Sequence, residues 1–313
     1  MARPNNSQVR IDRLLSNVSI GMMQNPNNFI FNKVFPIIPV EDQSAKYIVY
    51  DTDDWNTDEA RVRKDSQESS GSGYNLSMDN YNCKVFAFHK DVGDQLADNA
   101  KGNIDLYTDA TKFVTQKLML RQELSWAEAY LTSGVWGDTQ VGTTDFDKFD
   151  EDTSTPIEFF SGEVVDMAEI GIEPNMLVMG YDLFNTLKNH ADFVDRIKYS
   201  MPDAISADIM AKLIGVDKIL VSKSVKATGK GETKTRSYTF GNSALLVYAA
   251  PAPGKLTPSG GYTFSWNYAG IGAVGIKRFY IQEKETTRIE GSVAFDSKVT
   301  AKDIGRLYTS CIS

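Results

Sequence analysis

The sequence predicts an α+β protein with an N-terminal arm, an extended β-hairpin loop, a lobe built on one long helix, and a second lobe of mixed α/β structure. Three observations lead to this prediction. The chain has 313 residues, of which 42% are hydrophobic, enough for about two lobes at roughly 100–200 residues each. Apolar residues recur at helical spacing over residues 105–133. From residue 156 onward, short strand and helix patterns alternate.

The chain begins with a segment whose charge is opposite in sign to that of the whole protein. The first 35 residues lack strand or helical spacing, and the arm is expected to cover residues 1–44. The whole chain has a formal net charge of −8 and a pI of about 5.0, which argues against a general nucleic-acid binder. The basic residues of the first 35, set against Asp12 alone, are Arg3, Arg10, Arg13 and Lys33. This segment has no apolar core of a secretory signal.

Residues 45–88 predict a long projecting hairpin. Strand patterns at 46–50 and 81–88 flank a polar stretch, in which residues 51–68 hold seven acidic and three basic side chains and residues 69–73 read SSGSG. An isolated two-stranded ribbon is only marginally stable in water. We therefore expect this loop to dock on another surface.

The long helix is predicted over 105–133, with Asp105 as its N-cap. At 1.5 Å per residue it would be about 40 Å long, which suits a mechanical spine. Its polar side carries Lys112, Lys117 and Arg121. Its apolar stripe is expected to be Leu106, Ala110, Phe113, Leu120, Leu124, Ala127 and Leu131.

The second lobe follows a polar linker at 137–155, and its first helix begins with Pro156. A return of residues 293–300 and 303–311 to the first lobe is expected. The other helices are expected at 182–190 and 204–213, and the strands at 176–179, 218–222, 238–240, 244–248, 262–266 and across 275–287.

Motifs for catalysis or metal binding are not found, so no enzyme activity, metal or cofactor is expected. The acidic run at 51–62 resembles a calcium loop, but Trp55, Asn56 and Val62 occupy positions that need a ligand, a glycine and a glutamate. A solvated loop that pairs with basic residues of a neighbour is the preferred interpretation. His190 is expected to cap a helix C-terminus, and Cys83 and Cys311 are expected to be buried, inert thiols.

A long co-linear string carries a family resemblance. Residues 173–199 read EPNMLVMGYDLFNTLKNHADFVDRIKY, residues 206–225 read SADIMAKLIGVDKILVSKSV, and residues 244–266 read ALLVYAAPAPGKLTPSGGYTFSW. Together they resemble the tailed-bacteriophage major capsid proteins of the Hong-Kong-97-type fold. The residues that fit the family's cadence are Pro174, Asn175, Gly180, Leu187, His190, Asp195, Arg196, Ile197, Lys198, Tyr199, Gly215, Val216, Asp217 and Lys218.

The resemblance implies a capsid subunit of four parts. They are the N-terminal arm (1–44), the extended loop (45–88), a peripheral domain with the spine helix 105–133 (89–155 and 276–313), and an axial domain (156–275). It implies self-assembly of identical subunits, as pentamers and hexamers, into the icosahedral shell around the double-stranded DNA of a tailed phage. The alternative is an encapsulin-like compartment shell of the same fold.

The resemblance also implies partners and a location. The partners are identical subunits, scaffold, portal or decoration proteins, and packaged double-stranded DNA bound without sequence preference; no membrane partner is expected. The location is the virion, after assembly in the bacterial host cytoplasm. Residues expected to contact neighbouring subunits are Arg10, Arg13, Phe29, Phe31, Asp53, Asp54, Trp55, Arg61 and Arg63. Those expected to face DNA, or alternatively to pair with the acidic loop of an adjacent subunit, are Arg3, Lys112, Lys117 and Arg121.

Overall fold

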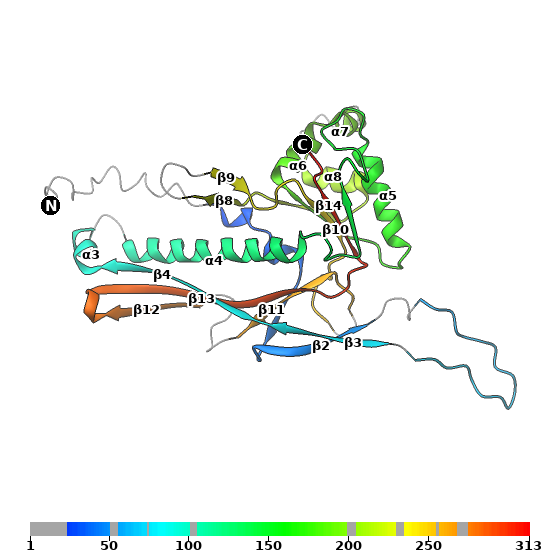
Figure 1. Ribbon diagram of the computed structural model, residues 1–313, viewed down its shortest axis with the longest axis horizontal. Helices are drawn as coiled ribbons and strands as arrows, with labels where there is room; N and C mark the ends of the chain where they lie inside the picture. Colours follow the sequence, from blue (N-terminus) through cyan, green and yellow to red (C-terminus); the bar gives the residue numbers. More distant parts are fainter. Residues whose placement is uncertain are drawn as a thin grey trace.

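The structure is a computed structural model, which describes residues 24–50, 56–73, 75–100, 105–198, 205–229, 235–254, 257–267 and 275–313. Figure 1 shows a long helix lying along a sheet of long strands, with a smaller lobe of helices and strands at one end of that helix. A two-stranded ribbon packs on the long sheet through Tyr47 and Tyr81, which both contact Phe264, and the loop that connects its strands projects away from the rest (Figure 1). The α+β class predicted from the sequence is confirmed.

The long sheet is organised around β13, Thr286–Val299. This strand pairs with β4 along one side and with β12 and then β11 along the other, all antiparallel. β1 adds to β11 in parallel. The bounds of these partners are β1 Ile37–Val40, β4 Lys84–Gly93, β11 Gly261–Trp266 and β12 Gly275–Ile281.

Helix α4, Leu106–Tyr130, packs across β4 and β13, and Asp105 caps it by accepting hydrogen bonds from two backbone N–H groups. The buried face differs from the predicted stripe, because Phe113 is 38% exposed and Leu120 and Leu124 are only half-buried. The residues that are buried recur mainly at every fourth position, and two of them are polar. A prediction based on apolar residues alone therefore placed the buried face of the helix beside its actual position. The buried residues are Ala110, Val114, Leu118, Gln122, Glu123, Trp126 and Tyr130.

Gly291 allows α4 to approach β13 closely. A Cβ atom at this position would lie 2.6 Å from Cγ1 of Val114 and 2.7 Å from Cδ1 of Leu118. Glycine inside a strand often marks such an approach by another element. The missing side chain therefore sets the distance between the helix and the sheet.

The two-stranded ribbon consists of β2, Ser44–Tyr50, and β3, Leu76–Asn82. The strand predicted at 81–88 is in fact divided between two sheets. β3 ends at Asn82, and β4 begins at Lys84 and pairs with β13 instead. Cys83, which separates them, is fully buried beside Phe264. Local composition predicts strand over both segments and cannot show the change of partner.

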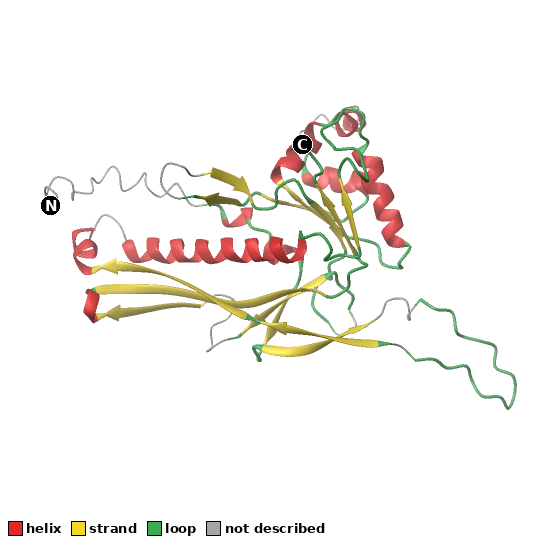
Figure 2. Ribbon diagram, viewed as in Figure 1, coloured by secondary structure: helices red, strands yellow, loops and turns green. Residues whose placement is uncertain are grey.

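The second lobe contains a sheet with the strand order β5-β14-β10-β6-β7. Its helices gather around this sheet (Figure 2), and every residue of β6 and β10 is buried. The strands are β5 Asp138–Val141, β6 Met176–Gly180, β7 Lys218–Ser222, β10 Ala244–Val247 and β14 Gly305–Thr309. The helices are α5 Pro156–Ala168, α6 Tyr181–Asn189, α7 Ala191–Ile197 and α8 Ala207–Ile214.

Three expectations about this lobe are corrected by the sheet pairings. The predicted linker at 137–155 contains β5, and β14, expected to return to the first lobe, pairs between β5 and β10 in the second. β11, expected in the axial domain, belongs to the long sheet. Short strands carry no local signal of their partners, so their sheet is set by tertiary pairing. The division into four functional domains stays a prediction.

His190 ends one helix and caps the start of the next. The single helix expected at 182–190 is followed by a second, α7, and Nδ1 of His190 accepts a hydrogen bond of 3.2 Å from the backbone N–H of Asp192. His190 is therefore the C-cap residue of α6, as expected, and its side chain also caps the N-terminus of α7.

The segment after residue 23 is not a free arm. Phe29, Ile30, Phe31 and Phe35 are buried against α4 and the second lobe. Alternating polar and apolar residues hide this burial from sequence periodicity. The remaining elements are the 3-10 turns η2 Pro26–Asn28 and η4 Gln282–Lys284, the helices α2 Phe31–Val34 and α3 Asp94–Ala100, and a hairpin of β8 Val225–Thr228 and β9 Thr235–Tyr238.

Candidate assembly surface

The loop between β2 and β3 is the part of the described chain least covered by its own subunit. All of residues 56–73 are exposed, and Val62 is 97% exposed. Nδ2 of Asn56 donates a hydrogen bond of 2.9 Å to the carbonyl oxygen of Ile170, which ties one end of the loop to the second lobe. The loop therefore presents its side chains outward.

The predicted contact residues fall into three groups. Arg61 and Arg63 are exposed on the loop. Phe29 and Phe31 are 1% and 9% exposed inside their own subunit, so their predicted contact with a neighbour is corrected: they are core residues. The others, outside the described residues, are Arg10, Arg13, Asp53, Asp54 and Trp55, as is Arg3 of the predicted DNA-facing set.

The predicted basic group on α4 does not form one surface. Lys117 lies 5.4 Å from the ring centre of Phe113, and Lys90 of β4 lies 5.2 Å from the same ring. Arg121 lies over Phe86 and forms an ion pair of 3.0 Å with Glu128. Each of these cations therefore lies over a phenyl ring at the contact between α4 and β4, which is called the α4–β4 seam below.

Lys112 lies apart from the α4–β4 seam. It follows Ala110, which faces the sheet, by two residues, and at about 100° per residue it is turned roughly 200° away. Lys112 is exposed. The sequence placed it correctly on the polar side but could not separate it from Lys117 and Arg121.

Beneath these surfaces, Glu123 joins three parts of the subunit. Its side chain is fully buried. One carboxylate oxygen accepts hydrogen bonds from the backbone N–H groups of Ile30 at 3.0 Å and Phe31 at 2.9 Å. The other accepts from the hydroxyl groups of Ser222 at 2.7 Å and Ser224 at 3.3 Å. One side chain of α4 thus holds the N-terminal segment and the second lobe together.

Burial has an electrostatic consequence at Glu123. Removal from water raises its pKa above the usual value, and the four hydrogen bonds oppose that rise. The donors are neutral groups, which satisfy a carboxylate without forming an ion pair. The four hydrogen bonds attach the N-terminal segment and the second lobe to α4.

A second carboxylate, Glu163 of α5, links that helix to two strands. One oxygen accepts from Arg306 at 2.6 Å and from the Tyr308 hydroxyl at 2.9 Å, and the other accepts from Gln140 at 3.1 Å. Burial and the neighbouring carboxylate raise the pKa of Tyr308. The network fixes α5 to β5 and β14.

Neither carboxylate was predicted to be buried, although the sequence contains a signal for both. Glu163 lies three residues after Phe160 and four before Met167, and both of these are fully buried. Glu123 likewise lies three residues before Trp126 on the buried face. A charged residue at a stripe position predicts a buried carboxylate with partners.

The two cysteines are buried, as expected, and are unpaired. Burial raises the pKa of Cys83 to about 11 and that of Cys311 to about 12. We expect neither thiol to be alkylated by iodoacetamide at about pH 8, because the reactive thiolate would be scarce and covered. Mass spectrometry after labelling tests this, and the same protein unfolded in urea, where both should react, is the control. Rapid labelling of the folded protein would contradict the buried placement.

Among the described residues, no cluster of three or more His, Cys, Asp or Glu side chains is arranged to hold a metal ion. None of the helices in these ranges has the length and apolar character needed to cross a membrane.

The sequence and the fold were compared with those of known proteins. No protein-family model matches the sequence. The chain is 25% identical over 273 residues to the major capsid protein of Burkholderia phage BcepMu, covering 82% of this chain and 84% of that one. The match runs along most of both proteins and is not confined to one lobe.

Solved structures show the same fold. A phage-related protein from Bordetella bronchiseptica matches with a TM-score of 0.69 and 21% identity, over 96% of this chain and 97% of that one. A cyanophage P-SCSP1u capsid chain matches with a TM-score of 0.62 and 11% identity, over 90% and 87%. The SrpI encapsulin of Synechococcus elongatus matches at 0.55 and 12%, over 98% and 95%.

The encapsulin likeness rests on fold alone, whereas the BcepMu protein is also similar in sequence. The capsid fold, the long helix on its sheet and the sequence similarity agree with one another. Together they make the chain similar to the tailed-phage major capsid proteins, and the solved structures show that it has the fold of that family, the Hong-Kong-97-type fold.

Proposed function

We propose that this chain assembles with identical copies, as pentamers and hexamers, into the icosahedral shell that encloses the double-stranded DNA genome of a tailed phage. The observation that carries the proposal is the similarity to the BcepMu major capsid protein over 82% of the chain. The exposed loop supports it, because residues 56–73 find no cover within their own subunit. Docking on a neighbour would supply that cover.

The role of the subunit is structural in this proposal, without catalysis. Its parts are an arm, the extended loop, a peripheral domain around α4 and an axial domain around the second sheet. The arm contributes its contacts from before residue 24, since the segment after it is buried in its own subunit. Assembly takes place in the host cytoplasm, and the product is part of the virion. Scaffold, portal and decoration proteins are further partners.

Expression of the full chain, followed by negative-stain electron microscopy and analytical ultracentrifugation, tests the function. Shells or capsomer rings are expected, with and without a co-expressed scaffold protein. A chain that stays monomeric at high concentration under both conditions would contradict the proposal. Enzyme cargo enclosed in shells made in the native host, in place of DNA, would favour the encapsulin-like alternative.

Val62 offers a sharp test of the loop. As Val62 is 97% exposed in the subunit, Val62→Asp should leave the subunit's thermal midpoint unchanged. In a shell, an interface that covers this side chain would bury the new charge, and we expect the yield of shells to fall by about tenfold or more. Sedimentation of assembly reactions measures the yield. Val62→Ile is the matched control and should assemble normally; equal assembly of the aspartate variant would show that the loop tip remains in solvent.

The basic residues of α4 lead to a separate proposal. We assign Lys112 and Lys117 to the inner wall, where they contact DNA phosphates, because the charge of Arg121 is already paired with Glu128. Lys112→Gln combined with Lys117→Gln should permit shell formation and lower the amount of DNA retained, most strongly at low salt, where phosphate contacts are strongest. Failure to form shells would instead indicate pairing with the acidic loop of an adjacent subunit.

A further inference from the structure

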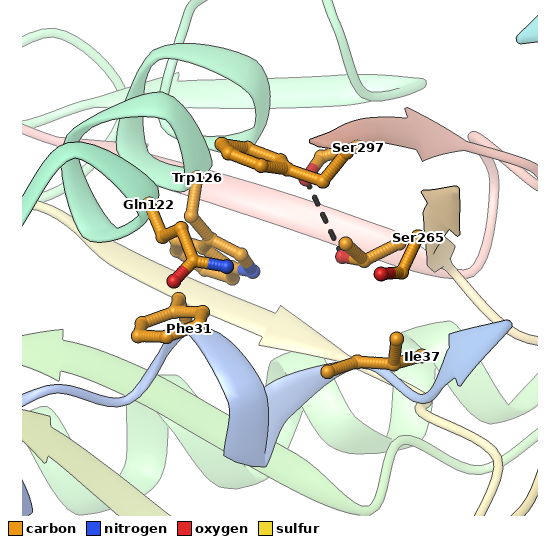
Figure 3. A pocket seen from close by; sticks show the side chains of 8 residues that line it. Phe31, Ile37, Gln122, Trp126, Ser265 and Ser297 are labelled. Carbon is orange, nitrogen blue, oxygen red and sulfur yellow. Dashed lines mark hydrogen bonds between the residues drawn. The ribbon is translucent and has the colours of Figure 1, made fainter. Parts of the chain in front are cut away.

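A small pocket lies where the N-terminal segment, α4 and the long sheet meet. Phe31 and Ile37 line it from the N-terminal segment, Gln122 and Trp126 from α4, and Ser265 and Ser297 from the sheet. Figure 3 shows these side chains around a common space, with the indole of Trp126 between Gln122 and the sheet. None of the roles described above uses this pocket.

The indole N–H of Trp126 finds no acceptor among the described residues. The side chain is 1% exposed, and Nε1 itself is buried without a hydrogen-bond partner. Trp136 and Trp266, in contrast, donate to backbone carbonyl oxygens at 2.7 Å and 2.8 Å. A buried donor left without an acceptor is costly and rare.

The ring of Trp126 cannot turn to find another acceptor. It is stacked on Phe240 with 5.1 Å between ring centres and 1° between planes, and it also contacts Tyr130 at 5.0 Å. The position of the N–H group is therefore fixed by the surrounding rings. Trp126 lines the pocket, so an acceptor bound there would lie next to this ring.

The volume of the pocket and the polar groups that line it determine which ligand can bind there. The cavity volume open to water is about 20 Å³, which is room for one water molecule and too little for a larger ligand. The hydroxyl groups of Ser265 and Ser297 line it, and Ser297 also shares a hydrogen bond of 3.3 Å with Thr263. A bound water needs two to four polar partners, and these groups supply them.

We propose that one structural water molecule binds in this pocket, accepts the hydrogen bond of the Trp126 indole, and donates to hydroxyl groups of the long sheet. The water would then accept the hydrogen bond of the Trp126 N–H group, which the packed rings hold away from any acceptor among the described residues. It joins α4 to β11 and β13 through hydrogen bonds, next to the point where Phe31 and Ile37 pack.

Ultraviolet resonance Raman spectroscopy of the assembled protein tests this, because an indole ring mode reports hydrogen bonding at its N–H. The spectrum of wild type minus that of Trp126→Phe isolates Trp126, and the same difference for Trp136→Phe supplies a hydrogen-bonded reference within the chain. We expect both bands at the hydrogen-bonded position. A Trp126 band at the position of free indole would overturn the proposal.

Three further variants identify the acceptor. Ser265→Val fills the pocket and should move the Trp126 band to the free position, whereas Ser292→Val, the same change on the sheet face turned away from α4, should not. Gln122→Leu should also leave the band in place. If Gln122→Leu moves it, or if Ser265→Val does not, the acceptor is a protein group and the water is excluded.

A density map provides a measurement that depends on no variant. At a resolution where other buried waters are visible, a peak is expected about 2.7–3.2 Å from Nε1 of Trp126. A pocket without density in such a map would overturn the proposal even if every variant failed to fold.

Discussion

Replacing Glu123 by alanine is expected to lower the free energy of unfolding by about 4 kcal/mol. The substitution leaves the backbone N–H groups of Ile30 and Phe31 without an acceptor in a buried site. It also removes the partner of the Ser222 hydroxyl. The N-terminal segment and the second lobe would both lose their attachment to α4, so assembly should fail as well. Differential scanning calorimetry of the purified protein measures the loss.

Glu123→Gln is the matched control, because one amide oxygen can still accept from both backbone N–H groups. It should cost much less than alanine; equal losses would show that the charge, and not the acceptor, is what matters. The pH dependence gives a second check. Since burial raises the pKa of Glu123 above 4.5, the folded state holds this proton more tightly than the unfolded one. Wild type should therefore lose stability relative to the glutamine variant as the pH rises through that raised pKa.

Gly180→Ala is expected to have a comparably large effect, about 3 kcal/mol or more. A Cβ atom here would overlap the backbone carbonyl oxygen of Gly241, and backbone cannot move aside as a flexible side chain can. The φ angle of Gly180 is −73°, so its conformation alone does not require glycine. The close approach of the chain at Gly241 does. We expect loss of soluble protein, or a much lower thermal midpoint by calorimetry.

Gly162→Ala provides the comparison for this prediction. Gly162 lies within α5, and a Cβ atom there meets nothing within 4 Å. Alanine should stabilise the helix by about 0.5–1 kcal/mol. If the two alanine variants behaved alike, contact at Gly180 would not be the reason for glycine at that position.

The parts of the fold predicted from sequence are those whose signal is local. Asp105 does cap a long helix, and Pro156 does begin α5, because capping and proline geometry depend on a few adjacent residues. The strand at Lys218–Ser222 was predicted with its observed bounds.

The parts that could not be predicted depend on contacts between distant residues. Cys83 separates two strands that belong to different sheets, and β14 pairs in the second lobe instead of the first. Phe29 and Phe31 look like an exposed apolar run until α4 covers them. Glu123 was overlooked because polar residues are assumed to face water, whereas four donors from two other segments make its burial possible.

The isolation of the loop has an evolutionary consequence. Substitutions in residues 56–73 hardly affect the folding of the subunit that carries them, since these side chains touch almost nothing of it. Selection would act on them only through the copy on which they dock. In related capsids, this segment should drift faster than the residues around Glu123. Its changes should covary with the partner surface, independently of the hydrophobic core.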